Sequence, residues 1–345
     1  MLAQLHIAGS AFELGLRLGE FGRESVNAKL RPLPLWQYLA SQADTDKAQQ
    51  MQTLVRERFA RYWQEIEGLA AGLELPVNEV FMWNCRGDYA ALPSVDGCTT
   101  VFGQTPQGTL IAHNEDGLPQ LRGDCAIVHA RPDEGAAFVS FIYPGSIAGH
   151  TFAVNEFGVV ATVNNLRPTT IPAGLPRMIL GRASLEARSI DEAIAAVAAT
   201  PRAGAFHHTF GQAGLARIVS AEATSTVTAL MEVHQTRGHA NHIVHDGLDS
   251  VGQLITGSSE SRQYRVDKLL ADAEGELDAS LALRILRDEH DAVLPIYRCA
   301  PDDSDDENTL ATAVFTLTAT TVEWRVYTRH DTARPDAEGV VFVSR

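Results

Sequence analysis

The hydrophobic pattern of this chain changes its period just before Cys98, and this change limits the folds that are available to it. Before it, five apolar residues recur at the spacing of one helix face: Phe59, Tyr62, Trp63, Ile66 and Leu69. After it, short apolar runs are joined by turn residues, which is typical of strands. Residues 1–95 are therefore predicted to be mostly helical, and a strand-rich half begins at Cys98.

Further helices interrupt the strands downstream. Pro176 suits a first helical turn, Ser189 begins a Ser-x-x-Glu capping box, and another helical stretch is predicted over about 260–290. Strands are predicted at 99–113 (a hairpin), 137–143, 151–155, 159–165, 216–222, 226–233, 240–244, 310–317 and 322–328. Helices, strands, helices and strands in this order predict an α+β fold with two sheets packed face to face and helices outside.

Cys98 follows directly after Gly97, and this junction has a distinct chemistry if the bond between them breaks. A free α-amine on Cys98, with a pKa of about 8, is able to take the proton of its own thiol without a histidine. Glycine on the attacked side lacks a Cβ and tolerates a strained backbone. Taken alone, however, an unpaired cysteine is more often a buried packing residue, and both interpretations remain open at this point.

A turn signal downstream connects Cys98 to a polar cluster. Pro106 and Gly108 lie between two β-rich runs, which predicts a hairpin that returns the chain toward its start. Asp116 then comes at the end of the second strand, beside the beginning of the first. We therefore expect the Asp116 carboxylate to lie within reach of Cys98.

Several segments together carry a family resemblance, through their order and spacing over nearly the whole chain. They are Asp96-Gly97-Cys98-Thr99, Asn114-Glu115-Asp116, Val154 to Val159, Gly174-Leu175-Pro176-Arg177, Glu186 to Ala193, Ala240-Asn241-His242, Ser259 to Arg262 and Ile285 to Asp288. On these motifs the chain resembles the penicillin acyltransferase (acyl-coenzyme A:6-aminopenicillanic acid acyltransferase) type family of N-terminal nucleophile cysteine hydrolases. That resemblance implies an αββα sandwich and a precursor that cleaves itself before an internal cysteine.

The resemblance also implies roles for matched positions. Cys98 corresponds to the nucleophile, Asp116 to the carboxylate near the new amine, Asn241 to the oxyanion-hole amide, and Arg262 to a site arginine. Substrate contacts are expected from Thr99, Asn114, His208 and His242. Two departures lie near the expected pocket: Gly117 stands where the family often has an aromatic residue, and residues 206–209 replace an Asn-Tyr pair.

Cleavage between Gly97 and Cys98 is expected to divide the chain into two pieces. Residues 1–97 form a mainly helical segment that stays bound without a covalent link, and residues 98–345 form the catalytic αββα chain; together they make one structural domain. The expected activity is that of an amidohydrolase or acyltransferase that acts on a small N-acyl, amide or thioester substrate through a thioester on Cys98. Hydrolysis and acyl transfer require the same residues, so the sequence leaves that choice open.

Three other interpretations stay open. A papain-like cysteine amidase would need one of the twelve histidines as a base, although the strand context of Cys98 disfavours it. A choloylglycine hydrolase-like enzyme uses similar residues, but its cysteine follows the initiator methionine, and here 97 residues precede Cys98. A non-catalytic protein that binds small amides would use the same pocket without turnover.

Histidines and acidic residues raise the question of a metal. His207, His208, His239, His242 and His245 are close in sequence, but within a strand His239 and His242 would point to opposite faces, so no metal is expected. The acidic run at 302–307 is interpreted as a solvated loop. No cofactor is expected, because no glycine-rich phosphate loop precedes a helix.

The net charge and the cysteine content limit which partners and which cellular compartment are expected. The net charge of -15 disfavours nucleic acid and anionic membrane surfaces as partners. Four widely spaced cysteines indicate a reducing compartment. No apolar run approaches the length of about 20 residues that spans a bilayer, so a cytoplasmic location is expected. The expected partners are a small-molecule amide or acyl substrate and the cleaved N-terminal piece; a homo-oligomer is left open.

Overall fold

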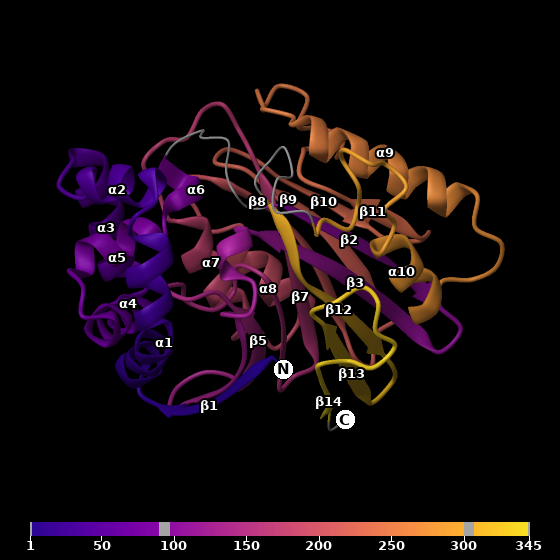
Figure 1. Cartoon of the computed structure of the whole chain (residues 1–345), viewed down its shortest axis with the longest axis horizontal. Helices are drawn as coiled ribbons and strands as arrows, with labels where there is room; N and C mark the ends of the chain where they lie inside the picture. The colour runs from indigo at the N-terminus through magenta and orange to yellow at the C-terminus, as the bar shows by residue number, and fades with distance from the viewer. Residues whose placement is uncertain (1, 90–96, 300–306, 344–345) are drawn as a thin grey trace.

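The computed structural model describes residues 2–89, 97–299 and 307–343. Two stacked sheets form its centre, and helices lie on both outer sides (Figure 1). The first sheet has the order β1 (Ala3–Gly9), β4 (Ala126–Pro132), β5 (Phe138–Ile142), β6 (Phe152–Asn155), β7 (Val159–Leu166), β8 (Ala205–Gln212), β9 (Ile218–Ala223), β10 (Thr228–Glu232). The second has the order β11 (Arg237–His239), β2 (Gly97–Thr105), β3 (Gly108–Gly117), β12 (Asn308–Leu317), β13 (Thr321–Tyr327), β14 (Ala337–Phe342).

The helices divide between the two outer faces. On the side of the eight-stranded sheet lie α1 (Ala11–Ser25), the π-helical turn Val26–Leu30, α2 (Pro34–Ser41), α3 (Asp46–Arg58), α4 (Ala60–Leu73), α5 (Val77–Trp83), α6 (Arg86–Tyr89), α7 (Arg177–Ser184) and α8 (Ile190–Val197). The six-stranded sheet is covered by α9 (Gly257–Ala271) and α10 (Ala279–Leu286). Among the pairings between the strands named above, only β1 with β4 is parallel. The predicted αββα sandwich is confirmed.

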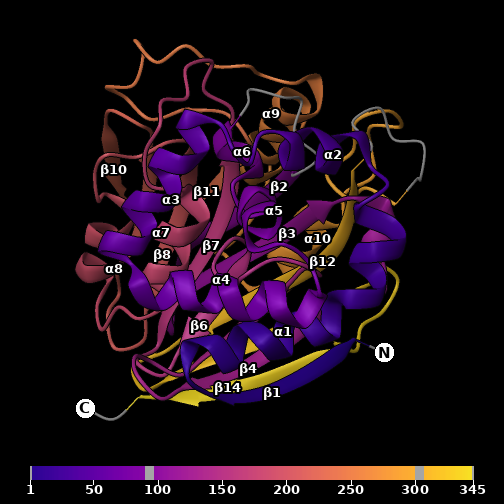
Figure 2. The ribbon, with the colours of Figure 1, turned by 90° about the vertical axis from the view of Figure 1, so that its left-hand side faces the viewer.

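Four glycines allow helices α1 and α4 to pack at backbone contact. A Cβ atom on Gly15 would overlap the carbonyl oxygen of Glu65, and one on Gly68 would overlap that of Phe12. Gly19 and Gly72 face each other in the same way one turn further along. Because no side chain separates the two helices here, they lie side by side as one layer, seen in front of the strands in Figure 2.

Most of the predicted elements are present, with differences at their edges. The hairpin is confirmed as β2 and β3, with Thr105 paired to Gly108 at the turn. Helices begin after Pro176 and Ser189 as expected, and the stretch 260–290 contains two helices rather than one. Five strands were not predicted: β1, β4, β8, β11 and β14. Within the described part of the chain, no helix is both long and apolar enough to cross a membrane.

The predicted strand at 240–244 is wrong, because β11 already ends at His239. The backbone N–H groups that follow donate to side-chain oxygens instead of a neighbouring strand: Ala240 to Gln263, Asn241 to Ser259, Ile243 to Gln253 and Val244 to Glu222, at 2.7–2.9 Å. The segment is therefore a loop held by side chains from other elements. It carries Asn241 to the active region.

Candidate active site

Cys98 lies near the start of β2, and its thiol points into the space between the two sheets. Its neighbour on the same face, Thr100, reaches across to Asn164 of the other sheet, with 2.7 Å between Oγ1 and Oδ1. The Cys98 side chain is only 3% exposed. Its backbone nitrogen donates to Asn241 Oδ1 at 2.9 Å, and its Sγ lies 3.9 Å from Glu115 Oε2.

Glu115 is the acidic residue directly opposite Cys98, and the sequence analysis did not assign it a role. The two residues are register partners in the β2–β3 hairpin. Glu115 Oε1 accepts a hydrogen bond from the Tyr143 hydroxyl at 2.5 Å, and Oε2 lies 3.0 Å from His113 Nε2. Burial lowers the pKa of His113 to about 3, so that imidazole is neutral at physiological pH.

Asp116 is placed one position further along β3, opposite Gly97. Since successive side chains alternate, its carboxylate lies on the other face of the sheet from the thiol. Oδ1 accepts a hydrogen bond from the Thr309 hydroxyl at 2.6 Å. Asp116 therefore lies beside the Gly97–Cys98 peptide rather than beside the sulfur.

Thr99 and Asn114 share that opposite face, beneath the helices that cover the six-stranded sheet. The Thr99 hydroxyl accepts from Arg262 Nη1 at 2.9 Å. Asn114 donates to the carbonyl of Leu286 and accepts from Thr312, both at 2.7 Å. The structure does not bring either side chain to the side of the thiol.

Asn241 and Arg262 form one network with the backbone of Cys98. Asn241 Oδ1 accepts from Cys98 N and, at 2.7 Å, from Arg262 Nη2, while its Nδ2 donates to the Asn165 carbonyl at 3.1 Å. Arg262 Nη1 donates to the Cys98 carbonyl at 2.5 Å. Burial lowers the pKa of Arg262, and the nearby Asp116 charge opposes that shift. Arg262 thus fixes the orientation of both Asn241 and Cys98.

His208 and His242 do not line the cavity that adjoins the thiol. His208 stacks on Phe210, with ring centroids 5.3 Å apart, and burial lowers its pKa to about 3. His242 Nδ1 lies 2.8 Å from the Ser259 hydroxyl, and burial lowers its pKa as well. The cavity wall beside Cys98 includes Phe206 rather than either histidine.

The cavity that adjoins the thiol is about 10 Å³, which is room for about one water molecule. Its wall is formed by Arg86, Cys98, Glu115, His150, Val163, Asn165, Arg177, Met178 and Phe206. Arg86 comes from the segment before Gly97, so both parts of the chain contribute to this site.

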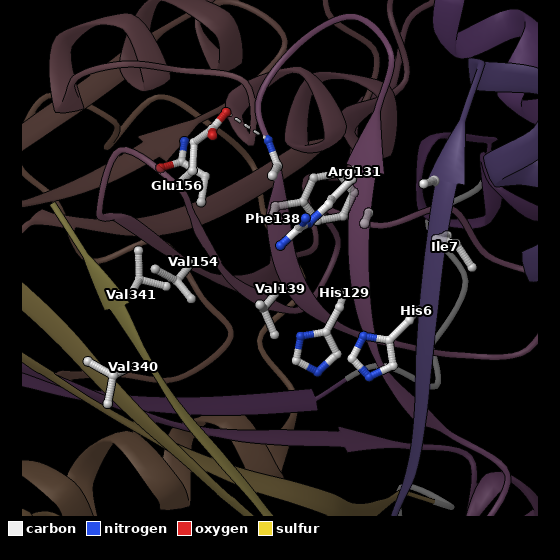
Figure 3. Close-up of a pocket in the computed structure, with 14 residues that line it drawn as sticks. His6, Ile7, His129, Arg131, Phe138, Val139, Val154, Glu156, Val340 and Val341 are labelled. Atoms are coloured by element: carbon white, nitrogen blue, oxygen red, sulfur yellow. Dashed lines mark hydrogen bonds between the residues drawn. The ribbon is translucent and has the colours of Figure 1, made fainter. Parts of the chain in front are cut away.

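A second cavity, of about 570 Å³, lies along β1, β4, β5 and β6 and reaches β14. Figure 3 shows His6 and His129 side by side at this place, with ring centroids 4.4 Å apart. Its wall is mainly aliphatic and contains neither a cysteine nor a serine. Of these two cavities, only the smaller one has a cysteine in its wall, so it is the candidate active site.

Gly97 packs against a buried ion pair. A Cβ atom at this position would overlap Glu307 Oε2, which accepts from Arg298 Nη1 at 2.5 Å. Arg167 Nη2 lies 3.6 Å from Glu307 Oε1. Burial raises the pKa of Glu307 to about 7, against the opposing effect of the arginines. Residues 302–306 lie outside the described residues, but for Glu307 the interpretation of a solvated loop is wrong, since it is 1% exposed.

Gly97→Ala is expected to slow cleavage at this junction by about tenfold, because overpacking a buried site costs about 1–3 kcal/mol. Glu307→Asp shortens the opposing side chain, so the double variant is expected to regain most of the rate. Intact mass gives the fraction of cleaved chain over time, and hence the cleavage rate of the single and of the double variant. Cleavage of Gly97→Ala at the wild-type rate would show that this contact does not matter.

Two groups of side chains approach the spacing of metal ligands among the described residues: His207, His239 and His245, and Cys98, His113 and Glu115. In the first group, His207 Nε2 and His245 Nε2 both bond to the Ser220 hydroxyl, and His239 Nε2 bonds to Glu222. In the second, both ring nitrogens of His113 are engaged by Thr100 and Glu115. These hydrogen bonds account for the arrangement, and we assign no metal to either group.

Comparison with known proteins places the chain among acyltransferases and amide hydrolases. The family model for acyl-coenzyme A:6-aminopenicillanic acid acyl-transferase matches residues 104–330. The acyl-coenzyme A:6-aminopenicillanic-acid-acyltransferase 40 kDa form of Emericella nidulans is 28% identical over 274 residues, 77% of this chain and 75% of that protein. The β-alanyl-dopamine/carcinine hydrolase of Drosophila melanogaster is 24% identical over 213 residues, 55% of each protein. The structure of penicillin V acylase from Agrobacterium tumefaciens gives a TM-score of 0.41 at 14% identity, covering 67% of this chain and 82% of that one.

Proposed function

Since this chain belongs to the acyl-coenzyme A:6-aminopenicillanic acid acyl-transferase family, we propose that it is a self-processing cysteine amidohydrolase or acyltransferase with Cys98 as its nucleophile. One observation carries the proposal. The backbone nitrogen that becomes an α-amine on cleavage is already held by Asn241 Oδ1 at 2.9 Å, inside a buried polar site. Asp116, opposite Gly97 in the register, places a carboxylate on the other face of the sheet beside that peptide.

In maturation, Cys98 Sγ attacks the carbonyl carbon of Gly97 and the C–N bond to Cys98 breaks. The proton that leaves sulfur is balanced by the proton that the new amine gains. Water then hydrolyses the thioester, which leaves a carboxylate on Gly97 and a free thiol on Cys98. Arg262, through its bond to the Cys98 carbonyl, keeps the residue in place during these steps.

The N-terminal piece has strong reasons to remain bound after cleavage. Strand β1 pairs with β4 along seven residues, from Ala3 opposite Ala126 to Gly9 opposite Pro132. Trp63 and Phe81 belong to the same hydrophobic core as Phe141 of the eight-stranded sheet. We therefore propose that residues 1–97 and 98–345 stay together as one structural domain.

The small volume beside the thiol supports a zymogen. A cavity of about 10 Å³ cannot admit an amide substrate, so we propose that binding requires the rearrangement that follows cleavage at Gly97. A substrate carbonyl then meets Cys98 Sγ, and the α-amine takes the thiol proton. Asn241 Nδ2 is the proposed donor to the oxyanion, together with a backbone N–H.

The substrate class is a small N-acyl amine or amino acid, or a thioester of the same acyl group. Water as the second reactant gives a hydrolase, and an amine gives an acyltransferase. The two curated relatives carry one name of each kind. We propose the hydrolase, since the sequence has no glycine-rich loop of the kind that binds coenzyme phosphates. A cytoplasmic location remains part of the proposal.

Activity is expected to rise with pH through an apparent pKa of about 8, the value of an α-amine. Alanine variants of His208 and His242 are expected to keep this ionisation, because the lowered pKa values of both leave them neutral across that range. Initial rates on a panel of amides and thioesters, measured over a range of pH, give this apparent pKa for each variant. Loss of the ionisation in a histidine variant would favour a papain-like enzyme, and no turnover of any panel member would favour a binding protein.

Thiol labelling provides the matching control. Burial raises the pKa of Cys85 and Cys125, and burial with the nearby Glu289 raises that of Cys299. Only Cys98 gains an amine base, so a thiol reagent is expected to modify it first. Peptide mass mapping reports the order.

A further inference from the structure

Before cleavage the nitrogen of Cys98 is an amide, so the amine base that serves turnover does not yet exist. The first attack on Gly97 therefore needs another group to take the thiol proton. That group has to lie within reach of Sγ in the uncleaved chain, which is the state that the structure describes. This question rests on the proposed self-processing at Cys98.

We propose that Glu115 is the proton acceptor of the self-cleavage step, and that His113 and Tyr143 position it. Its Oε2 lies 3.9 Å from Cys98 Sγ, within the range of a hydrogen bond to sulfur. The contact is built into the hairpin, because the two residues are opposite each other in the register and project from the same face. Glu115 is 2% exposed, so bulk water does not compete for the thiol proton.

The hydrogen bonds around His113 fix where its protons lie. Asn164 Nδ2 donates to the His239 carbonyl at 3.1 Å, so its Oδ1 is turned toward Thr100 and accepts the single hydroxyl proton of that residue at 2.7 Å. His113 Nδ1, 2.8 Å from the same hydroxyl oxygen, must then be a donor.

It follows that a proton is shared between His113 and Glu115. A neutral ring that is protonated at Nδ1 has a lone pair at Nε2, and this atom lies 3.0 Å from Glu115 Oε2. Two acceptors do not approach so closely without a proton between them. The pair therefore holds one proton between a carboxyl oxygen and an imidazole nitrogen, and because the ring is neutral this proton rests on the Glu115 carboxyl.

The carboxyl group is able to take another proton because it passes this one to His113 Nε2 in the same step. As Sγ bonds to the Gly97 carbonyl carbon, its proton moves to Glu115 Oε2, and the proton already there moves to His113 Nε2. When the C–N bond breaks, one proton returns to the nitrogen of Cys98, so the pair ends as it began. The thiol is acylated, the amide becomes an amine, and no reactant besides water is needed to complete the hydrolysis.

Tyr143 holds the other carboxyl oxygen. Its hydroxyl donates to Oε1 at 2.5 Å, which keeps Oε2 directed at the thiol. After cleavage the Cys98 amine lies on the same residue as the sulfur and replaces Glu115 as the base. Glu115 is therefore needed in processing far more than in turnover, and a purely structural residue would not show that split.

Glu115→Gln tests the proposal with little change of shape. The amide nitrogen still donates to His113 Nε2 and the amide oxygen still accepts from Tyr143, but the side chain no longer takes a proton. We expect self-cleavage to slow by about 10²–10⁴-fold, the usual contribution of a positioned base. The full-length chain is made in a cell-free reaction and the cleaved fraction is followed by intact mass. Tyr143→Phe, which keeps the carboxylate, is the matched control and is expected to slow cleavage only a few-fold.

A second variant tests whether a loss of cleavage is due to misfolding. Glu115→Ala opens a space beside the thiol, and added formate is expected to restore part of its cleavage rate, while chloride at the same ionic strength is not. Wild-type and Glu115→Gln chains that cleave at equal rates would overturn the role of Glu115 and leave self-processing intact. A wild-type chain that never cleaves would overturn self-processing and this role with it.

Discussion

Cys98→Ala is expected to leave all 345 residues in one chain and to reduce amide turnover to the background rate. The variant removes the only side chain in the small cavity that is able to form a thioester, which is the proposed attacking group of both maturation and turnover. Alanine fits the space left by the buried thiol, so the fold is expected to persist.

The other cysteines provide matched controls for this variant. Cys85 and Cys125 are buried and Cys299 is exposed, and none of them lines the cavity at Cys98. Alanine at each of these positions is expected to leave cleavage and turnover near the wild-type rate. Rates on an amide substrate and the mass of each purified variant measure both properties. Full turnover by Cys98→Ala would place the nucleophile elsewhere.

Asn241→Ala is expected to lower turnover by about 10²–10³-fold, which is the usual cost of losing one oxyanion-hole donor. The same substitution removes the acceptor that holds the Cys98 nitrogen and one of the acceptors of Arg262. Since a buried guanidinium without its partner is costly, the thermal midpoint of the variant has to be measured beside its activity.

Asn241→Asp separates the two roles of this side chain. It keeps an oxygen for the Cys98 nitrogen and for Arg262 but loses the Nδ2 donor, so the lower kcat is expected to remain while the fold recovers. Comparing kcat and KM for the two variants on one amide substrate makes the distinction. An Asn241→Asp enzyme with unchanged kcat would contradict the oxyanion assignment.

The residue opposite Cys98 in the hairpin could be predicted from the sequence. The turn at Pro106–Gly108 predicts two paired strands, and a turn of that length makes Glu115 the partner of Cys98. The carboxylate predicted to lie near Cys98, from the hairpin and from the family resemblance, was Asp116, one position further on. Alternation along a strand then places Asp116 on the other face.

Residues that meet from distant segments were not predictable in the same way. Glu307 ends an acidic run that is typical of a solvated loop, and its burial depends on Arg298, Arg167 and Gly97. Asn241 belongs to an apolar, β-rich stretch, yet side chains from Glu222 to Gln263 bond to its backbone and hold it as a loop. Periodicity describes the face that a segment presents, but it does not identify remote partners.

The missed strands have local causes as well. β1 lies before the helical pattern, and although every second residue is exposed, only Ile7 of this strand is fully buried. β8 includes Phe206, His207 and His208, all buried in the eight-stranded sheet, and Phe206 also lines the cavity beside Cys98. A run of histidines is unusual in a core strand. Here Asn164 and Ser220 satisfy both ring nitrogens of His207, whereas His208 stacks on Phe210.

The central claim is that this chain becomes active by cleaving itself before Cys98. Intact-mass analysis of the purified wild-type protein, under conditions in which it turns over an amide, tests it most directly. The account predicts two masses, those of residues 1–97 and 98–345, which elute together in gel filtration, with cysteine as the first residue of the larger piece. A single mass for all 345 residues in an active preparation would contradict it.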